Sequence, residues 1–240
     1  MALDFTRFGC LTFDCYGTLI DWEQGILGAL LPILKTHGAH APDSMLLRNY
    51  AELEAQLEAG EYRSYRNILE DIVRGIGERL GFIPSHEEIV SLPESLPHWE
   101  PFADTRAALL RLKTKYRLAI ISNTDDDLFA GTARKLNIEF DHVITAQQAR
   151  SYKPSQNNFV LAMRKIGLPA EEILHVGQSA YHDVVPAKSL GMGTVWVTRR
   201  KVKEGIAATL PASGQPDLEV PDLKSLADAV GVSDVSMRQV

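Results

Sequence analysis

The stretch Leu11-Thr12-Phe13-Asp14-Cys15-Tyr16-Gly17-Thr18-Leu19 decides the fold of this 240-residue chain. An apolar run typical of a buried strand ends at the carboxylate of Asp14, and a turn that contains Gly17 and Thr18 follows at once. Open α/β sheets bind ligands at the carboxyl ends of their strands, where a glycine turn can direct backbone N–H groups at an anion. We therefore predict that Asp14 is a functional carboxylate at the end of the first strand.

The chain after this strand is predicted to be helical. Apolar residues recur at helical spacing over Trp22–His37, Ser44–Ala59 and Tyr65–Leu80, and a shorter helix is expected within Pro84–Ser91. Connections between a strand and the next helix normally have only a few residues. We therefore predict that residues 20–98 are an all-helical cap inserted after the first strand.

Strands and helices alternate from residue 99 onward. Strands are expected at Leu118–Ser122, His142–Thr145, Ile173–Val176, Thr194–Thr198 and, at the edge, Leu218–Val220, with helices at Thr105–Tyr116, Asp126–Leu136, Gln156–Ile166, Asp183–Leu190 and Leu223–Val230. Repeated strand–helix units of this length predict an α/β core with a doubly wound parallel sheet, formed by residues 1–19 and 99–240. The end of the chain, from Ser233 to Val240, is expected to be frayed.

Composition narrows the functional class. The formal net charge of −6 argues against nucleic acid or an anionic membrane as the main partner. The sequence has no recognisable export signal and no apolar run of about 20 residues, so we expect a soluble cytoplasmic protein. Cys10 and Cys15 lie in or beside the same strand, which predicts neither a disulfide framework nor a zinc site.

Polar residues follow several of the predicted strands. They are Asp14, Ser122 with Asn123, Lys153 and Asp183. Each has an ordinary alternative, such as a helix cap at Ser122-Asn123 or a solvated loop lysine at Lys153. In a parallel sheet, however, these ends share one edge, so all four are expected to converge on one crevice.

In their order and combination these residues resemble the haloacid dehalogenase superfamily. The resemblance rests on Phe13–Leu19, Ile120–Asn123, Tyr152–Pro154 and His175–Ser179 with His182-Asp183. It implies a Rossmann-like core with a helical cap, Asp14 as the nucleophile, Thr18 and Ser122 as anion-binding hydroxyls, and Lys153 as the cation of the site.

Two departures separate this chain from the Mg²⁺-dependent phosphatases of the superfamily. Those relatives usually have an aspartate two residues after the nucleophile, where this chain has Tyr16, and an acidic metal ligand where it has Gln178. Tyrosine, with a pKa near 10, replaces a carboxylic acid poorly, and Mg²⁺ prefers anionic oxygen ligands. We therefore predict a metal-independent enzyme without a cofactor and keep a Mg²⁺-dependent phosphatase as an alternative.

The resemblance is closer to the 2-haloacid dehalogenase branch, in which a tyrosine stands at the same spacing. It implies that Asp14 attacks C2 of a small 2-haloalkanoate, and that water then hydrolyses the ester to the 2-hydroxy acid. Thr18, Ser122, Asn123 and the backbone N–H groups after Asp14, those of Cys15 and Tyr16, would bind the substrate carboxylate. Asp183 would hold Lys153 or orient the water.

The resemblance also implies roles for several cap and pocket residues. Arg48 is the candidate for the cap arginine that holds the leaving halide, although a slight shift of the alignment places Ala51 there. Phe159 would form an aromatic wall, without the hydroxyl of the tyrosine found in the dehalogenases. Gly177 and Ser179 stand where those enzymes have a serine and an asparagine. His182 is either an acid/base group or a helix-start residue, and Tyr16 and Trp22 are candidate pocket walls.

A second metal-free branch remains open. Phe13–Trp22 and Tyr181–Asp183 also resemble azetidine-2-carboxylate hydrolases, which break a C–N bond in a strained ring. Both branches act on small 2-substituted carboxylates, so we expect such a molecule as the partner. The family also suggests a possible homodimer formed through cap helices.

Overall fold

A six-stranded parallel sheet with β1 (Cys10–Phe13) near its centre organises the computed structural model, which describes residues 3–199 and 214–233. The strand order is β3-β2-β1-β4-β5-β6. The other strands are β2 (Arg117–Ser122), β3 (His142–Thr145), β4 (Ile173–Gly177), β5 (Gly193–Val197) and β6 (Leu218–Val220). The order reverses direction at β1, between β2 and β4, which is where sheets of this class bind ligands.

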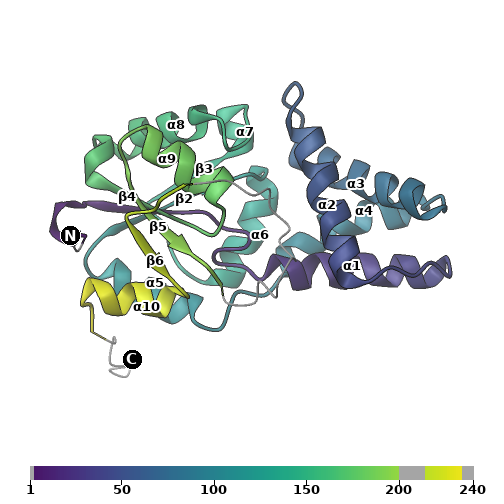
Figure 1. Ribbon diagram of the computed structural model, residues 1–240, viewed down its shortest axis with the longest axis horizontal. Helices are drawn as coiled ribbons and strands as arrows, with labels where there is room; N and C mark the ends of the chain where they lie inside the picture. The colour runs from purple at the N-terminus through teal and green to yellow at the C-terminus, as the bar shows by residue number, and fades with distance from the viewer. Residues whose placement is uncertain (1–2, 200–213, 234–240) are drawn as a thin grey trace.

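Helices cover both faces of the sheet (Figure 1). They are α5 (Thr105–Lys113), α6 (Asp126–Leu136), α7 (Ala146–Ala149), α8 (Gln156–Ile166), α9 (Val185–Ser189) and α10 (Leu223–Val230), with short 3₁₀ turns at Phe5–Arg7, Leu96–His98 and Ala170–Glu172. In β1, Leu11 and Phe13 join the apolar core on the side of α5 and α10, whereas Cys10 joins the core on the side of α8. The alternation follows from the two-residue period of a strand. The doubly wound α/β core is therefore as predicted.

Four consecutive helices lie to one side of the sheet (Figure 1). They are α1 (Trp22–Thr36), α2 (Asp43–Glu58), α3 (Tyr65–Leu80) and α4 (His86–Ser95), and residues 20–98 contain no strand. Their apolar stripes pack on one another, and this core is continuous with the one under the sheet. We propose that this helical group is the cap predicted for residues 20–98.

Three local details differ from the prediction. Helix α4 is longer than expected and continues through Pro93. Helix α1 contains Pro32 without being divided by it. The helix expected from Asp183 begins earlier, as a single π-helical turn over Ala180–Val184 that leads into α9. The expected frayed end lies almost wholly outside the described residues, which stop at 233.

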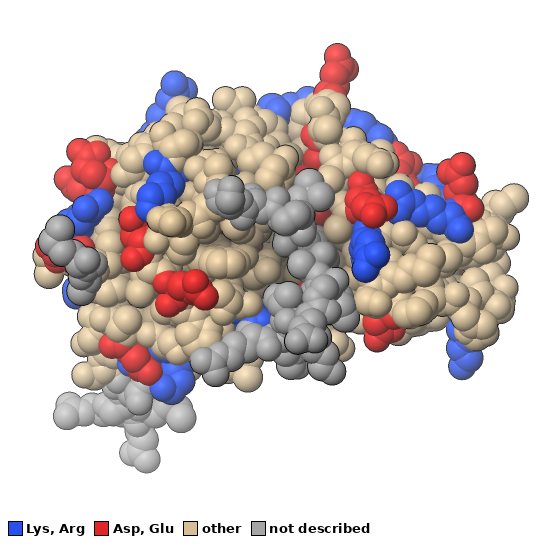
Figure 2. All heavy atoms as spheres, in the orientation of Figure 1, with Lys and Arg blue, Asp and Glu red and all other residues tan. Residues whose placement is uncertain are grey.

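Both cysteines, Cys10 and Cys15, are free and buried. Over residues 3–199 and 214–233, no helix combines the length and apolar character needed to span a bilayer. Figure 2 shows acidic and basic side chains interspersed over one face of the molecule, on the sheet side and on the helical side alike.

Candidate active site

The loop after β1 holds Asp14 in a fixed orientation. The Asp14 N–H donates to the carbonyl of Val176 on β4 at 3.0 Å, so the backbone remains in the sheet up to this residue. Gly17 has a φ of +94°, which favours glycine. The turn brings back Thr18, whose hydroxyl donates to Asp14 Oδ2 at 2.7 Å and accepts the N–H of Gln178 at 2.9 Å.

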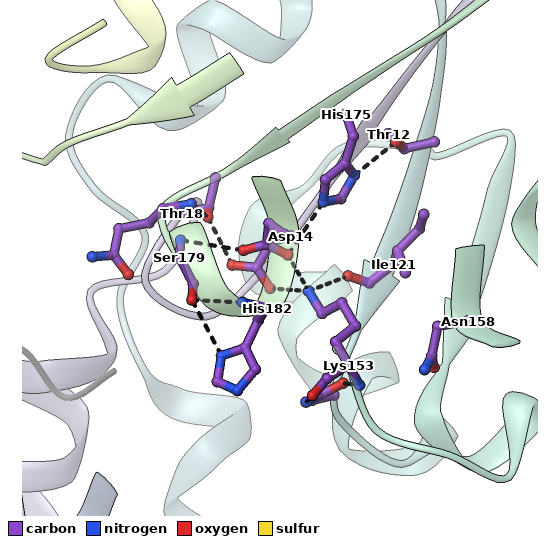
Figure 3. A network of polar contacts seen from close by, with 12 residues as sticks. Thr12, Asp14, Thr18, Ile121, Lys153, Asn158, His175, Ser179 and His182 are labelled. Atoms are coloured by element: carbon purple, nitrogen blue, oxygen red, sulfur yellow. Dashed lines mark hydrogen bonds and ion pairs between the residues drawn. The ribbon is translucent and has the colours of Figure 1, made fainter. Parts of the chain in front are cut away.

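Lys153 lies between two carboxylates (Figure 3). Its Nζ donates to Asp14 Oδ1 at 2.8 Å, to Asp183 Oδ1 at 2.7 Å and to the carbonyl of Ile121 at 2.9 Å. Its backbone is held by Asn123, which accepts the Lys153 N–H at 2.7 Å and donates to the Lys153 carbonyl at 3.1 Å. All three ammonium protons therefore have an acceptor, and the side chain has one orientation.

Asp183 is supported by the strand beneath it and by the turn that carries it. Its Oδ1 lies 3.2 Å from His175 Nε2, and its Oδ2 accepts the N–H of Ser179 at 3.2 Å. On the other side of the ring, His175 Nδ1 lies 2.8 Å from the hydroxyl of Thr12. The Asp183 side chain lies so close to the backbone of Gly177 that a Cβ placed on this residue would be 2.5 Å from it, which explains the glycine there.

The charge states of Asp14, Lys153 and Asp183 depend on their burial and on one another. Burial raises the pKa of Asp14 above its usual value and Asp183 adds to the rise, whereas Lys153 and Thr18 oppose it. The same lysine, with His175, holds the pKa of Asp183 far below its usual value despite burial. The two carboxylates raise the pKa of Lys153. Both Asp14 oxygens accept hydrogen bonds, as an ionised carboxylate does.

A cavity lies between this edge of the sheet and the helical group. Its lining residues are Asp14, Tyr16, Trp22, Glu54, Glu58, Tyr65, Ser122, Asn123, Lys153, Gln178, Ser179, His182 and Asp183. The predicted residues Asp14, Tyr16, Ser122, Asn123, Lys153, Ser179 and Asp183 are thus brought together. Ser122 Oγ is buried and has no hydrogen-bond partner among the described residues. It is therefore available to a ligand.

Four of the predicted binding residues do not line the cavity: Cys15, Thr18, Arg48 and Phe159. Thr18 acts through Asp14, to which it donates. The Cys15 side chain is fully buried, and burial raises the pKa of its thiol well above the usual value. Phe159 is also fully buried, with its ring edge-on to His175 at 5.1 Å, so it supports the site from below the sheet.

Arg48 is the clearest correction. It is exposed on α2 and is absent from the cavity wall. Glu54, which does line the cavity, lies six residues later on the same helix, about 240° further round its axis. The side chain of Arg48 therefore leaves α2 on a different face.

The cap contributes acidic residues to the site that were not predicted from the sequence. Glu54 and Glu58 are one helical turn apart on α2, and both line the cavity together with Tyr65 of α3. Glu54 follows Leu47 and Tyr50 at seven and four residues, so it continues the buried apolar stripe of α2. An acidic residue in that stripe was the available signal.

Tyr16, Trp22 and His182, the candidate pocket walls and the candidate acid/base group, all line the cavity. Tyr16 directs its hydroxyl to Thr132 Oγ1 on α6 at 2.9 Å, so its ring forms the wall. Trp22 packs edge-on against Tyr50. The His182 N–H donates to Ser179 Oγ at 3.0 Å, and burial lowers the pKa of its ring to about 4. The imidazole is therefore neutral near pH 7.

The acidic groups of the core do not fit a Mg²⁺ site. Asp14 and Asp183 are each bonded to the Lys153 ammonium, and Gln178 contributes no charge. No cluster of three or more Asp, Glu, His or Cys side chains suited to a metal occurs in the described parts of the chain. Mg²⁺ binds at protein carboxylates that are free to ligate it.

Comparisons with known proteins agree with this geometry. The family model for haloacid dehalogenase-like hydrolases matches residues 8–191. An (S)-2-haloacid dehalogenase of Pseudomonas fluorescens is 30% identical over 195 residues, which are 78% of this chain and 83% of that enzyme. One from Pseudomonas putida is 29% identical over 79% of this chain and 84% of its own length.

A solved dehalogenase structure has the same fold as this chain. The L-2-haloacid dehalogenase of Xanthobacter autotrophicus superposes with a TM-score of 0.80, over 93% of this chain and 98% of that one, at 20% identity. The family match, the curated relatives and the Asp14–Lys153–Asp183 arrangement agree with one another. The chain belongs to the haloacid dehalogenase-like hydrolases, in their 2-haloacid dehalogenase branch.

Proposed function

We propose that this protein is a metal-independent 2-haloacid dehalogenase that converts small 2-haloalkanoates to 2-hydroxy acids and halide through an ester on Asp14. The observation that carries the proposal is the Lys153 ammonium, which bridges Asp14 and Asp183 at 2.8 and 2.7 Å. A cation fixed between the two carboxylates keeps the nucleophile charged and oriented without a divalent metal. The activity of the curated relatives supports the same reaction.

The first step is displacement at carbon. Ser122 Oγ has no partner in the described part of the chain, and it would donate to the substrate carboxylate together with the backbone N–H groups that follow Asp14. One oxygen of Asp14 then attacks C2, the C–X bond breaks, and the electron pair leaves with X. Tyr16 and Trp22 would exclude bulk water during this step.

The second step is hydrolysis of the ester. Water adds to Cγ of Asp14 and releases the 2-hydroxy acid, so one oxygen from water stays in the Asp14 carboxylate. Asp183 serves to hold Lys153 in this scheme, because its Oδ1 is already occupied by the ammonium and the His175 ring. The neutral His182 ring and Ser179 line the space that the water would enter.

A single turnover in ¹⁸O water tests the proposal. With enzyme in excess over 2-chloropropionate and EDTA present, we expect the peptide that carries Asp14 to gain one heavy oxygen, and the product to contain none from that turnover. Label found in the product instead of the peptide would rule out the ester.

The companion variant is Asp14→Asn, which keeps the shape of the side chain. We expect halide release to fall by at least about 10³-fold, because a neutral amide is a very weak nucleophile. Thermal unfolding of the variant serves as the folding control. Activity restricted to p-nitrophenyl phosphate, and dependent on Mg²⁺, would instead support a phosphatase.

A further inference from the structure

The cap side of the cavity is acidic, and Lys153 is the one cation among those lining residues that belong to the described ranges 3–199 and 214–233. Among the described cap residues, a departing halide on this side would meet Glu54 and Glu58, and no arginine. An ionised carboxylate repels an anion, whereas a protonated carboxyl group can donate a hydrogen to it. The state of these two groups therefore determines which leaving groups the site can release.

Two tyrosines fix where Glu54 carries a proton. The hydroxyl of Tyr65 donates to Glu54 Oε1 at 2.6 Å. The hydroxyl of Tyr50 lies 3.1 Å from the same Glu54 oxygen and 2.9 Å from the Tyr65 hydroxyl. Oε1 is thus used as an acceptor. Oε2 has no hydrogen bond among the described residues, and Glu54 lines the cavity. A proton on this carboxyl group is therefore carried by Oε2, the oxygen open to a ligand.

The charged and titratable neighbours of Glu54 favour that proton. Glu58, on the same helix, faces the Asn123 amide at 3.3 Å, and Asp14 approaches from the sheet. Asp14 adds negative charge, whereas burial and Glu54 raise the pKa of Glu58 itself well above its usual value. Lys153 is already satisfied by Asp14 and Asp183. Burial, with Asp14 adding to it, raises the pKa of Glu54 to about 7 against the two tyrosine hydrogen bonds.

We propose that Glu54 is a catalytic acid of this site, which protonates the leaving group from Oε2 as Asp14 displaces it. The inference rests on the proposed ester mechanism. Asp14 forms the C2–O bond, the C2–X bond breaks, and X takes the Glu54 proton with the electron pair and leaves as HX. Hydrolysis of the ester uses one water: one hydrogen goes to the oxygen on C2, and the other returns to Glu54.

This role gives the site a leaving-group preference. Protonation helps most when X binds a proton strongly, as fluoride and a ring nitrogen do, and helps little when X is bromide. The acidic cap wall therefore suits 2-fluoro acids and cyclic amines with nitrogen on C2, and the second class includes the azetidine-2-carboxylate hydrolysis left open by the sequence.

The test compares the wild type with Glu54→Gln on three probes: 2-bromopropionate, 2-fluoropropionate and azetidine-2-carboxylate. Glutamine keeps an Oε1 acceptor for the tyrosines but cannot supply the proton. We expect kcat for the fluoro acid, the ring amine or both to fall by about 10²-fold or more, and kcat for the bromo acid by less than about 10-fold. Bromide release thereby measures folded, competent enzyme in the same preparation.

The pH profile adds a readout that a structural role would not move. With the wild type, kcat for the fluoro acid or the ring amine should fall as the pH rises through about 7, since Glu54 loses its proton. The profile for the bromo acid should lack this descending limb. Glu58→Gln, which replaces the neighbouring buried carboxyl group one turn away, should alter all probes alike and keep the limb.

Equal losses on every probe, or no turnover of either protonation-dependent probe by the wild type, would overturn the role of Glu54 while bromide release still supported the ester mechanism. Full activity of Asp14→Asn on the bromo acid would instead reject the proposed function, and the role of Glu54 with it.

Discussion

Glu54 is a buried carboxyl group whose ionisation has a cost in stability. Its pKa is raised to about 7 in the folded protein, from an ordinary value of 4.5. A folded pKa above the unfolded one means that the folded state binds protons more tightly. The resulting stability is fully present below pH 4.5 and is lost as the pH rises through about 7.

Replacement of Glu54 by glutamine should therefore stabilise the protein most at high pH. A difference of about 2.5 pKa units corresponds to roughly 3 kcal/mol, at about 1.4 kcal/mol per unit. We expect the free energy of unfolding of E54Q, relative to the wild type, to rise between pH 4.5 and 8 by up to that amount. Urea unfolding at a series of pH values measures it.

The matched control is Glu78→Gln, at an exposed glutamate near the end of α3. The free energy of unfolding of E78Q should stay within about 0.5 kcal/mol of the wild-type value at every pH. A difference for E54Q that does not grow with pH would mean that Glu54 does not titrate in this range.

At the scale of elements, the loop after β2 is tied to the cap helix α3. The Asp125 carboxylate, on that loop, accepts the backbone N–H of Tyr65 at 3.0 Å and that of Arg66 at 2.9 Å. These groups belong to the first turn of α3, where backbone donors have no partner within the helix and negative charge is favourable. The Tyr152 hydroxyl adds a bond to the carbonyl of Arg63 at 2.7 Å. Together they hold the cap in contact with the core.

Asp125→Ala should loosen the cap without unfolding the core. The two bonds to the helix N–H groups are lost, together with the one from the Tyr62 hydroxyl, so we expect the opening free energy of the first amides of α3 to fall by about 1–3 kcal/mol. Hydrogen exchange at Tyr65 and Arg66 measures this, with a rise in KM as the kinetic counterpart.

Asp127→Ala is the control for the cap contact, because it removes the exposed ion pair between Asp127 and Arg66 and leaves Asp125 in place. Such pairs contribute about 1 kcal/mol or less. Equal exchange in the two variants would contradict the role given to Asp125.

Across the whole fold, the sequence predicted the architecture well because the strands are marked by their apolar composition and several of them are followed by a polar residue. Asp14, Lys153 and Asp183 converge as expected because the ends of parallel strands share an edge. The sequence pattern could not reveal which face of the cap helix α2 is turned toward the cavity. Arg48 and Glu54 are both charged residues of this helix, and the packing of the helix determines which of them lines the cavity.

The net charge of the chain affects how an anionic substrate arrives. The protein carries a formal charge of −6, whereas Lys153 is buried among its partners. Added salt shortens the screening length from about 30 Å at 0.01 M to about 8 Å at 0.15 M, which weakens surface repulsion but does not reach the buried pair.

We therefore expect kcat/KM for 2-chloropropionate to rise by up to about threefold over that interval, with kcat unchanged. Sodium sulfate should be the added salt, because halide is a product. A change in kcat would mean that salt acts on the buried charges.

The close approach of the Ala180–Val184 turn to β4 has an evolutionary consequence. Because the space beside Gly177 is filled by Asp183, a serine introduced there cannot be accommodated unless that turn is rebuilt. A larger side chain at residue 177 is thus compatible with this fold only if the segment that follows changes with it. A single Gly177→Ser change would therefore displace Asp183, and with it the carboxylate that holds Lys153.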